Sequence, residues 1–253
     1  MSEILKVGIV LLYLGITILV LRLLELRIYV ESITASLRAI FQLLIVGSIL
    51  LAVFKADSVY INILVLAGMI TIAAYTSAQR TRLPGTGGVA LFTIATTSII
   101  IILPMLFFGV FDAASRFLIP VSGMIIGNAM NSTSLALERL DREIRSNREE
   151  IEAYLSLGLD PKTAVKEYVK ASVTASLIPR LNGLKTTGIV HIPGLMTGMV
   201  LSGQDPILAA EFQAILLYLI FIGAAVASLL ATHLAQGRYF TPYEALREFT
   251  QEA

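Results

Sequence analysis

The amino-acid sequence predicts an all-α membrane protein, a polytopic bundle of about seven transmembrane helices with a cytoplasmic helix-turn-helix hairpin between the fifth and sixth. Hydrophobic residues make up 56% of the 253 residues, and the mean hydropathy is +0.81. Charged residues are only 15%, against roughly 25% in an average soluble domain. A soluble fold this apolar could not cover its own surface with polar groups, so lipid is expected to be part of its solvent.

Apolar stretches of spanning length are the third observation, because a helix needs roughly 20 mostly apolar residues to cross a bilayer core. Seven stretches come near that length: 4–21, 34–54, 59–76, 88–109, 116–137, 186–203 and 208–235. The sixth is the weakest, because Pro193 and several glycines interrupt it, and a broken or partly re-entrant segment is the alternative there. Together the stretches predict a single transmembrane domain over residues 1–253.

The basic residues sort by side of the membrane. With seven spans, only Lys6, Lys55 and Arg116 of the 19 Lys and Arg residues fall on one side, and the others fall on the opposite side. Basic residues concentrate in cytoplasmic loops, so the N-terminus is predicted outside and the C-terminus inside, in a plasma (inner) membrane. The net charge of +1 gives no indication of a nucleic-acid partner.

The segment 138–185 is the one long loop, and it is predicted to project into the cytoplasm as a helical hairpin. Apolar residues at three- and four-residue steps predict an amphipathic helix that continues the fifth span; they are Leu137, Leu140, Ile144, Ile151 and Leu155. Gly158 is a typical helix stop, and Asp160 followed by Pro161 is a typical helix start. The second helix of the hairpin is expected to end before Pro179.

Part of this hairpin resembles a known docking loop. The run Glu152-Ala153-Tyr154-Leu155-Ser156-Leu157-Gly158 is similar to the Glu-Ala-Ala-x-x-x-Gly loop by which permeases of ABC transporters dock a short helix into a cleft of their ATPase. The resemblance implies a docking surface for a cytoplasmic ABC ATPase, made of Glu149, Glu152, Ala153, Tyr154, Leu155 and Gly158. Periodicity alone leaves open the alternative that the hairpin is only a solvated surface.

Longer motifs elsewhere point to one family. They are Gly127-Asn128-Ala129-Met130-Asn131, the run 185–198, Arg38-x-x-x-Gln42-Leu43, Gly203-x-x-Pro206 and Gln213. In sequence and order they resemble motifs of the FetB-type ABC exporter permease family, which includes bacterial iron-export permeases and related plant aluminium-tolerance permeases. The resemblance implies a permease homodimer that works with two separately encoded ATPase chains and exports a metal such as iron, or another small solute.

Motifs for ATP binding and for catalysis are missing from the sequence. There is no Gly-x-x-x-x-Gly-Lys-[Ser/Thr] phosphate loop, and the glycine cluster from Pro84 to Gly88 is not followed by Lys. His-Glu-x-x-His and Gly-x-Ser-x-Gly are also missing. The chain is therefore predicted not to be an enzyme and to bind no cofactor of its own, with ATP used by the partner subunit.

Polar and soft side chains inside the predicted spans are candidates for a solute pathway, because such groups are costly in lipid and usually face protein or water. Asn128 and Asn131 lie three residues apart, on one helix face. The full candidate set is Arg38, Gln42, Asn128, Met130, Asn131, Met196, Thr197 and Gln213. The alternatives are that the asparagines only bond neighbouring helices and that the methionines only fill gaps.

A resident metal site is not identified by the sequence. Cys is absent, and His191 and His233 have no partner at ligand spacing. The runner-up function is a secondary transporter or channel for a small ion or solute. A carrier driven by an ion gradient needs no cytoplasmic hairpin, and no convincing internal inverted repeat is found, so the ABC permease is the leading interpretation.

Overall fold

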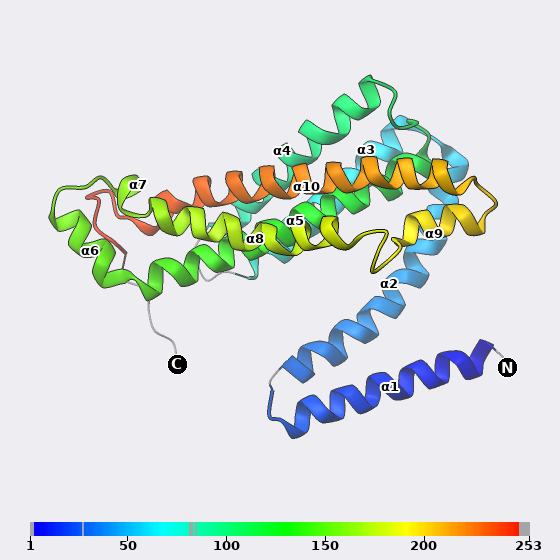
Figure 1. Cartoon of the computed structure of the whole chain (residues 1–253), viewed down its shortest axis with the longest axis horizontal. Coiled ribbons are helices and arrows are strands. Elements are labelled where there is room, and N and C mark those ends of the chain that lie inside the picture. Colours follow the sequence, from blue (N-terminus) through cyan, green and yellow to red (C-terminus); the bar gives the residue numbers. More distant parts are fainter. Residues whose placement is uncertain (1–2, 27, 81–82, 84, 248–253) are drawn as a thin grey trace. The chain divides into compact units, whose positions relative to one another are not determined.

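The computed structural model describes residues 3–26, 28–80, 83 and 85–247, and the regular elements among them are helices (Figure 1). They are α1 (Glu3–Leu23), α2 (Ile28–Ala56), α3 (Val59–Ala78), α4 (Thr86–Phe107), α5 (Ser115–Ser146), α6 (Arg148–Ser156), α7 (Pro161–Ala164), α8 (Lys166–Thr186), α9 (Gly194–Leu201), α10 (Pro206–Gln236) and the 3-10 helix η1 (Gly237–Tyr239). The strand-like pairings in the described residues are two isolated bridges, Thr187–His191 and Phe240–Leu246. The predicted all-α class is confirmed.

The chain divides into two compact units, Met1–Asp57 and Ser58–Ala253. The first unit is a helical hairpin in which α1 packs against α2. Its large apolar side chains are mostly exposed, for example Leu43 at 72%. Water would make such a surface costly, so lipid or protein must cover it. The prediction of a single domain over residues 1–253 stays a prediction.

The second unit is built around α5, which packs against α3, α4, α8 and α10. Within this unit α5, α8 and α10 run side by side, and α6 and α7 lie at one end (Figure 1). Small residues bring α10 close to α4, because a Cβ atom on Gly223 would lie 2.8 Å from Ile101 Cδ1. Small residues at helix contacts let backbones approach closely, as is typical of membrane bundles.

Four helices in the described part of the chain are long and apolar enough to cross a membrane: Ile28–Ala56, Val59–Ala78, Thr86–Phe107 and Pro206–Tyr239. They correspond to the second, third, fourth and seventh predicted spans. The first predicted span lies in a shorter apolar helix, Val7–Leu23. The fifth lies in α5, whose 32 residues also include a charged second half. The count of about seven is therefore supported for four spans and stays a prediction beyond them.

The sixth predicted span, 186–203, is not one continuous helix. α8 runs to Thr186, a turn follows in which the Gly188 N–H donates to the His191 carbonyl at 2.9 Å, and α9 covers only eight residues. Eight residues rise about 12 Å, well short of a core about 30 Å thick. Gly188 turns the chain with a left-handed φ of 82°. The segment is broken, as the alternative read from the sequence had it, and its crossing of the membrane stays a prediction.

The first helix of the predicted hairpin agrees with the expectation, and the second is longer than predicted. α5 continues to Ser146, and α6 ends just before Gly158, whose φ of 86° is left-handed, as the sequence indicated. α8, however, does not stop before Pro179 but passes through it. Contacts of α8 with both α5 and α10 compensate for the backbone hydrogen bond that a proline cannot donate.

Candidate functional site

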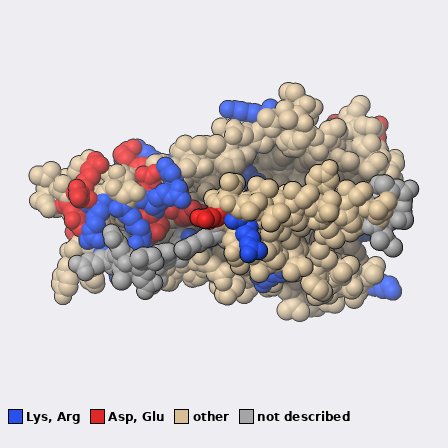
Figure 2. Space-filling model, turned by 90° about the horizontal axis from the view of Figure 1, so that it is seen from below, with Lys and Arg blue, Asp and Glu red and all other residues tan. Residues whose placement is uncertain are grey.

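The residues predicted to dock an ATPase lie at one end of the second unit, formed by α6, α7 and residues 237–247, which we name the charged end. Lys, Arg, Asp and Glu side chains gather there, at the left in Figure 2, whereas other residues dominate the long helices. α5 stops at Asn147, whose side-chain Nδ2 donates to the Glu143 carbonyl at 2.8 Å. Side-chain bonds of this kind compete with the helical ladder, so the chain restarts there as α6.

Ile151 fastens α6 to the rest of the charged end. Its side chain is fully buried, in a cluster drawn from α5, α7, η1 and the residues around them. The other members with no exposed surface are Leu140, Ile144, Val165, Ala231, Ala235 and Tyr239. Tyr154 and Leu155 pack against this cluster and are partly buried. The apolar stripe read from the sequence therefore holds α6 in place.

The predicted docking residues divide into two groups by exposure. Glu149, Glu152, Ala153 and Gly158 are exposed. Tyr154 and Leu155 are half-buried, so they support α6 more than they present a surface. Asp160 begins the next helix as expected, because its Oδ2 accepts the Thr163 N–H at 3.1 Å. The result is an exposed helical turn on a rigid base.

Glu150 links α6 to α8. Its Oε1 accepts a hydrogen bond from Tyr154 Oη at 2.6 Å, and the hydroxyls of Tyr154 and then Tyr168 hold the pKa of Glu150 below its ordinary value. Burial, followed by the nearby Glu150 carboxylate, raises the pKa of Tyr168 to about 12. Because the pKa of Glu150 is lowered, the link is present at neutral pH and is lost as the pH falls through that lowered value.

Residues 237–247, the C-terminal segment of the charged end, fold back onto α5 and α6. Tyr239 Oη lies 3.4 Å from Asp141 Oδ1 on α5, and burial raises the pKa of this tyrosine. Arg148 pairs with Glu152 at 2.7 Å and also donates to the Arg247 carbonyl at 3.4 Å. The segment is thus tied both to α5 and to the beginning of α6.

A groove of about 350 Å³ lies between the end of α6 and this C-terminal segment. Its lining residues are Leu155, Ser156, Gly158, Leu159, Tyr243, Glu244 and Ala245. Nearby, the side chains of Leu157 and Tyr243 are 78% and 92% exposed. Large exposed apolar side chains beside a groove are typical of protein interaction sites. The sequence reasoning missed Tyr243, although an aromatic residue in a charged segment outside the apolar stretches was an available signal.

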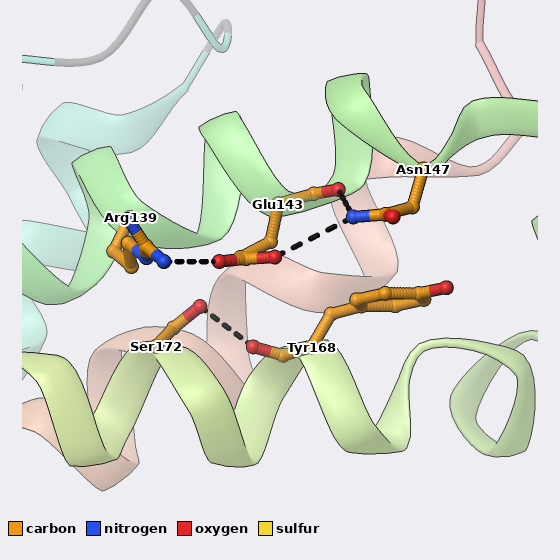
Figure 3. Close-up of polar contacts among 5 residues, drawn as sticks. All are labelled: Arg139, Glu143, Asn147, Tyr168 and Ser172. Carbon is orange, nitrogen blue, oxygen red and sulfur yellow. Dashed lines mark hydrogen bonds and ion pairs between the residues drawn. The ribbon is translucent and has the colours of Figure 1, made fainter.

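Facing side chains show how α5 and α8 pair along the bundle (Figure 3). Arg139 binds Glu143 at 2.7 Å, and Asn147 Nδ2 lies 3.4 Å from Glu143 Oε2. These α5 side chains face Tyr168 and Ser172 of α8 (Figure 3). The chain reverses through α6 and α7, so the two helices are antiparallel, with Arg139 level with Ser172.

The predicted pathway residues of α5 occupy different surroundings. Asn131 is exposed and Asn128 is half-buried. Asn128 Nδ2 donates to the Met124 carbonyl at 2.7 Å, which leaves its amide oxygen open within the described residues. Met130 instead packs against a buried apolar cluster of α3, α4 and α5 that includes Ala74. Of the three predicted residues on α5, the two asparagines thus lie outside that apolar cluster.

The break between α8 and α9 brings together three more predicted residues. Gln213 is buried at 5% exposure, and its Oε1 lies 3.4 Å from the backbone N–H of Met196. Thr197 is exposed and donates to the Pro193 carbonyl at 3.1 Å. Gln213 thereby holds the first turn of α9. Arg38 and Gln42 belong to α2 of the first unit, where both are exposed.

No group of three or more His, Cys, Asp or Glu side chains comes together to hold a metal ion in the described part of the chain. His191 is exposed in the turn before α9. His233 Nδ1 lies 3.0 Å from Gln236 Nε2 on the same helix. Each histidine thus lacks the converging ligands that a metal cage needs.

Comparison with known proteins places the chain in a family. A family model described as "Uncharacterised protein family (UPF0014)" matches residues 4–240. The UPF0014 membrane protein slr1647 of Synechocystis is 34% identical over 92% of this chain and 92% of its own length. Protein ALUMINUM SENSITIVE 3 of Arabidopsis thaliana is 34% identical over 83% of this chain and 78% of its own.

A further relative carries a functional name. The probable iron export permease protein FetB of Escherichia coli is 30% identical over 80% of this chain and 79% of its own length. No solved structure matches the chain. The resemblance read from the motifs is confirmed, and the apolar helices agree with the membrane location that the relatives' names give. The chain belongs to the UPF0014 family of membrane proteins.

Proposed function

We propose that this chain is the membrane-spanning permease subunit of an ABC exporter, driven by a separate cytoplasmic ATPase that docks on the charged end. The observation that carries the proposal is the exposed turn of α6 on a buried base, with Glu149, Glu152 and Ala153 outward and Ile151 inward. A rigid exposed turn can transmit closure of a partner to the helices behind it. α6 follows α5 after a break at Asn147, so a push on α6 reaches a helix of the bundle.

The groove beside α6 extends this docking surface. Leu157 and Tyr243 would supply apolar contacts, and the groove would receive a side chain of the ATPase. Glu244 lines the groove, and Glu149 and Glu152 are exposed on α6. These carboxylates favour a basic surface on the partner. ATP would be bound by that partner and not by this chain.

In this proposal the chain crosses the plasma (inner) membrane seven times, with the N-terminus outside and the charged end in the cytoplasm. The sorting of Lys and Arg supports the orientation. α8 and α9 together would make the sixth crossing, since they follow each other and both pack against α10. Broken helices of this kind are common at transport sites. Two permease chains would pair as a homodimer in the bilayer.

The solute is proposed to be small, and the name of the FetB relative favours iron. Asn128, Asn131, Met196, Thr197 and Gln213 remain the proposed pathway residues of the second unit. For Arg38 and Gln42 of the first unit, a pathway role stays a prediction from the sequence. A secondary transporter or channel is the second candidate, because the same polar helix faces could serve a gradient-driven carrier. The anchored α6 turn and the groove are what favour the ABC permease over it.

Reversing two charges of the docking turn, Glu149→Lys with Glu152→Lys, is expected to reduce copurification of the cognate ATPase at least tenfold. The permease should still fold, because the two carboxylates are exposed and surface ion pairs contribute little stability. The measurement is recovery of the ATPase with tagged full-length permease. Glu167→Lys is the matched control, since Glu167 forms a similar exposed pair with Lys170 on α8. Unchanged recovery in the double variant would contradict the docking assignment.

A further inference from the structure

Arg180 is a charged side chain of a long helix to which the proposed function gives no role. It lies on α8, at four-residue steps from Ser172 and Ser176, and so on the face by which α8 packs in the bundle. It is half-buried, and within the described residues it makes no hydrogen bond or ion pair. A cation in this position needs a counter-charge, because an unpaired charge is costly away from water.

The depth of Arg180 follows from a contact between α8 and α10. Ser176 Oγ bonds Ser228 Oγ at 2.8 Å, and both side chains are buried. Ser228 stands ten residues before Arg238, which is about 15 Å along a helix. Arg180 is one turn further along α8, about 6 Å deeper. It therefore stands about 20 Å along the bundle from the level of Arg238, beside the middle of α10, a helix that is long and apolar enough to cross a membrane.

The register of α5 and α8 brings the two asparagines to the same depth. Arg139 is level with Ser172 (Figure 3). Eight residues back along α5 is Asn131, and eight residues onward along the antiparallel α8 is Arg180. Asn128 is one further turn along α5. One cation and two amides thus stand within about one helical turn of the same level on two neighbouring helices.

The charges that α5, α8 and α10 carry near this level have one sign. Residues 117–137 of α5 contain no charged side chain, and residues 171–185 of α8 contain Arg180 and Lys185 alone. The one carboxylate of α10 is Glu211, which stands 17 residues, about 25 Å, from Ser228 and so about 19 Å along the helix from the level of Arg180. It is too far along the helix to neutralise Arg180.

We infer that the solute that crosses at this level is an anion, and that Arg180 is its principal binding group, with Asn128 and Asn131 as hydrogen-bonding neighbours. An arginine fork binds carboxylate or phosphate oxygens with two parallel hydrogen bonds. A bare metal cation would be repelled by Arg180 and would find no cluster of acidic or histidine ligands in the described residues. A metal would then cross as a negatively charged complex. This inference rests on the proposed transport function and names its substrate class.

Binding to the purified full-length permease in nanodiscs tests the inference without the ATPase. The soluble probes are citrate, ferric citrate and inorganic phosphate, with ferrous ion alone as the cationic probe. We expect at least one anionic probe to bind the wild type, Arg180→Gln to weaken it about tenfold, and Arg180→Lys to keep part of the affinity. Lys166→Gln removes an exposed cation at the start of α8 and should leave binding unchanged.

Three outcomes would overturn the anion assignment. They are binding of ferrous ion alone at undiminished affinity in Arg180→Gln, no binding of any anionic probe to the wild type, and anion binding unaffected by both Arg180 variants. Nanodiscs with and without anionic phospholipid separate a soluble ligand from a lipid headgroup. Dependence of the Arg180 effect on that lipid alone would assign the residue to lipid and also overturn the inference. Because these assays omit the ATPase, such results leave the copurification test of docking untouched.

Discussion

Replacing Ile151 with alanine is expected to destabilise the charged end by about 2–5 kcal/mol, because a large fully buried side chain is lost and a cavity remains. α6 has only nine residues and cannot be stable by itself, so the loss should release it from the bundle. Hydrogen exchange of the α6 amides in the full-length protein measures the change. Copurification of the ATPase should fall in parallel.

Leu157→Ala is the matched control for that experiment, since it shortens an apolar side chain that is 78% exposed. Its effect on α6 exchange is expected to stay within about 0.5 kcal/mol, as is usual for surface positions. Equal exchange rates in the two variants would show that α6 is not held by the buried cluster. The proposed docking surface would then have no rigid base.

Replacing Asn128 and Asn131 together with alanine is expected to lower transport about tenfold without unfolding the protein. The reason is that two amides that are open to a solute would be removed, and each hydrogen bond contributes about 0.5–1.5 kcal/mol. Asn131 is exposed and Asn128 is bonded only within its own helix, so packing should change little. Transport rate and thermal stability are measured side by side.

Thr71→Ala on α3 is the control for the asparagine pair, because Thr71 is exposed and also bonds back along its own helix, to the Ala67 carbonyl at 2.8 Å. It should leave transport unchanged. If the asparagine variant keeps wild-type transport, the two residues have no pathway role. If it loses stability as much as transport, they act as packing residues.

Long apolar stretches and local helix signals could be read directly from the sequence. α2, α3, α4 and α10 follow from hydropathy, because a span is a property of one continuous segment. The end of α6 just before Gly158 and the start of α7 after Asp160 follow from local backbone chemistry. The buried stripe through Leu140, Ile144 and Ile151 follows from helical periodicity.

Features that depend on packing between distant segments could not be read in the same way. Pro179 marks a helix end by local rules, but α5 and α10 flank α8 and carry it through the proline. Arg180 was counted only as a basic residue for orientation, since its depth appears only from the contact of Ser176 with Ser228. The place of Tyr243 in the groove could not be predicted either, because it depends on residues 237–247 packing beside the end of α6.

Uptake of solute by inside-out vesicles tests whether ATP hydrolysis in a docked partner drives export through this chain. Vesicles would hold the permease with or without its ATPase, and the solute would be labelled iron supplied as its citrate complex. For an ABC exporter we expect uptake only when permease, ATPase and hydrolysable ATP are all present. Uptake by the permease alone, driven by a proton or sodium gradient, would contradict it and establish a secondary transporter instead.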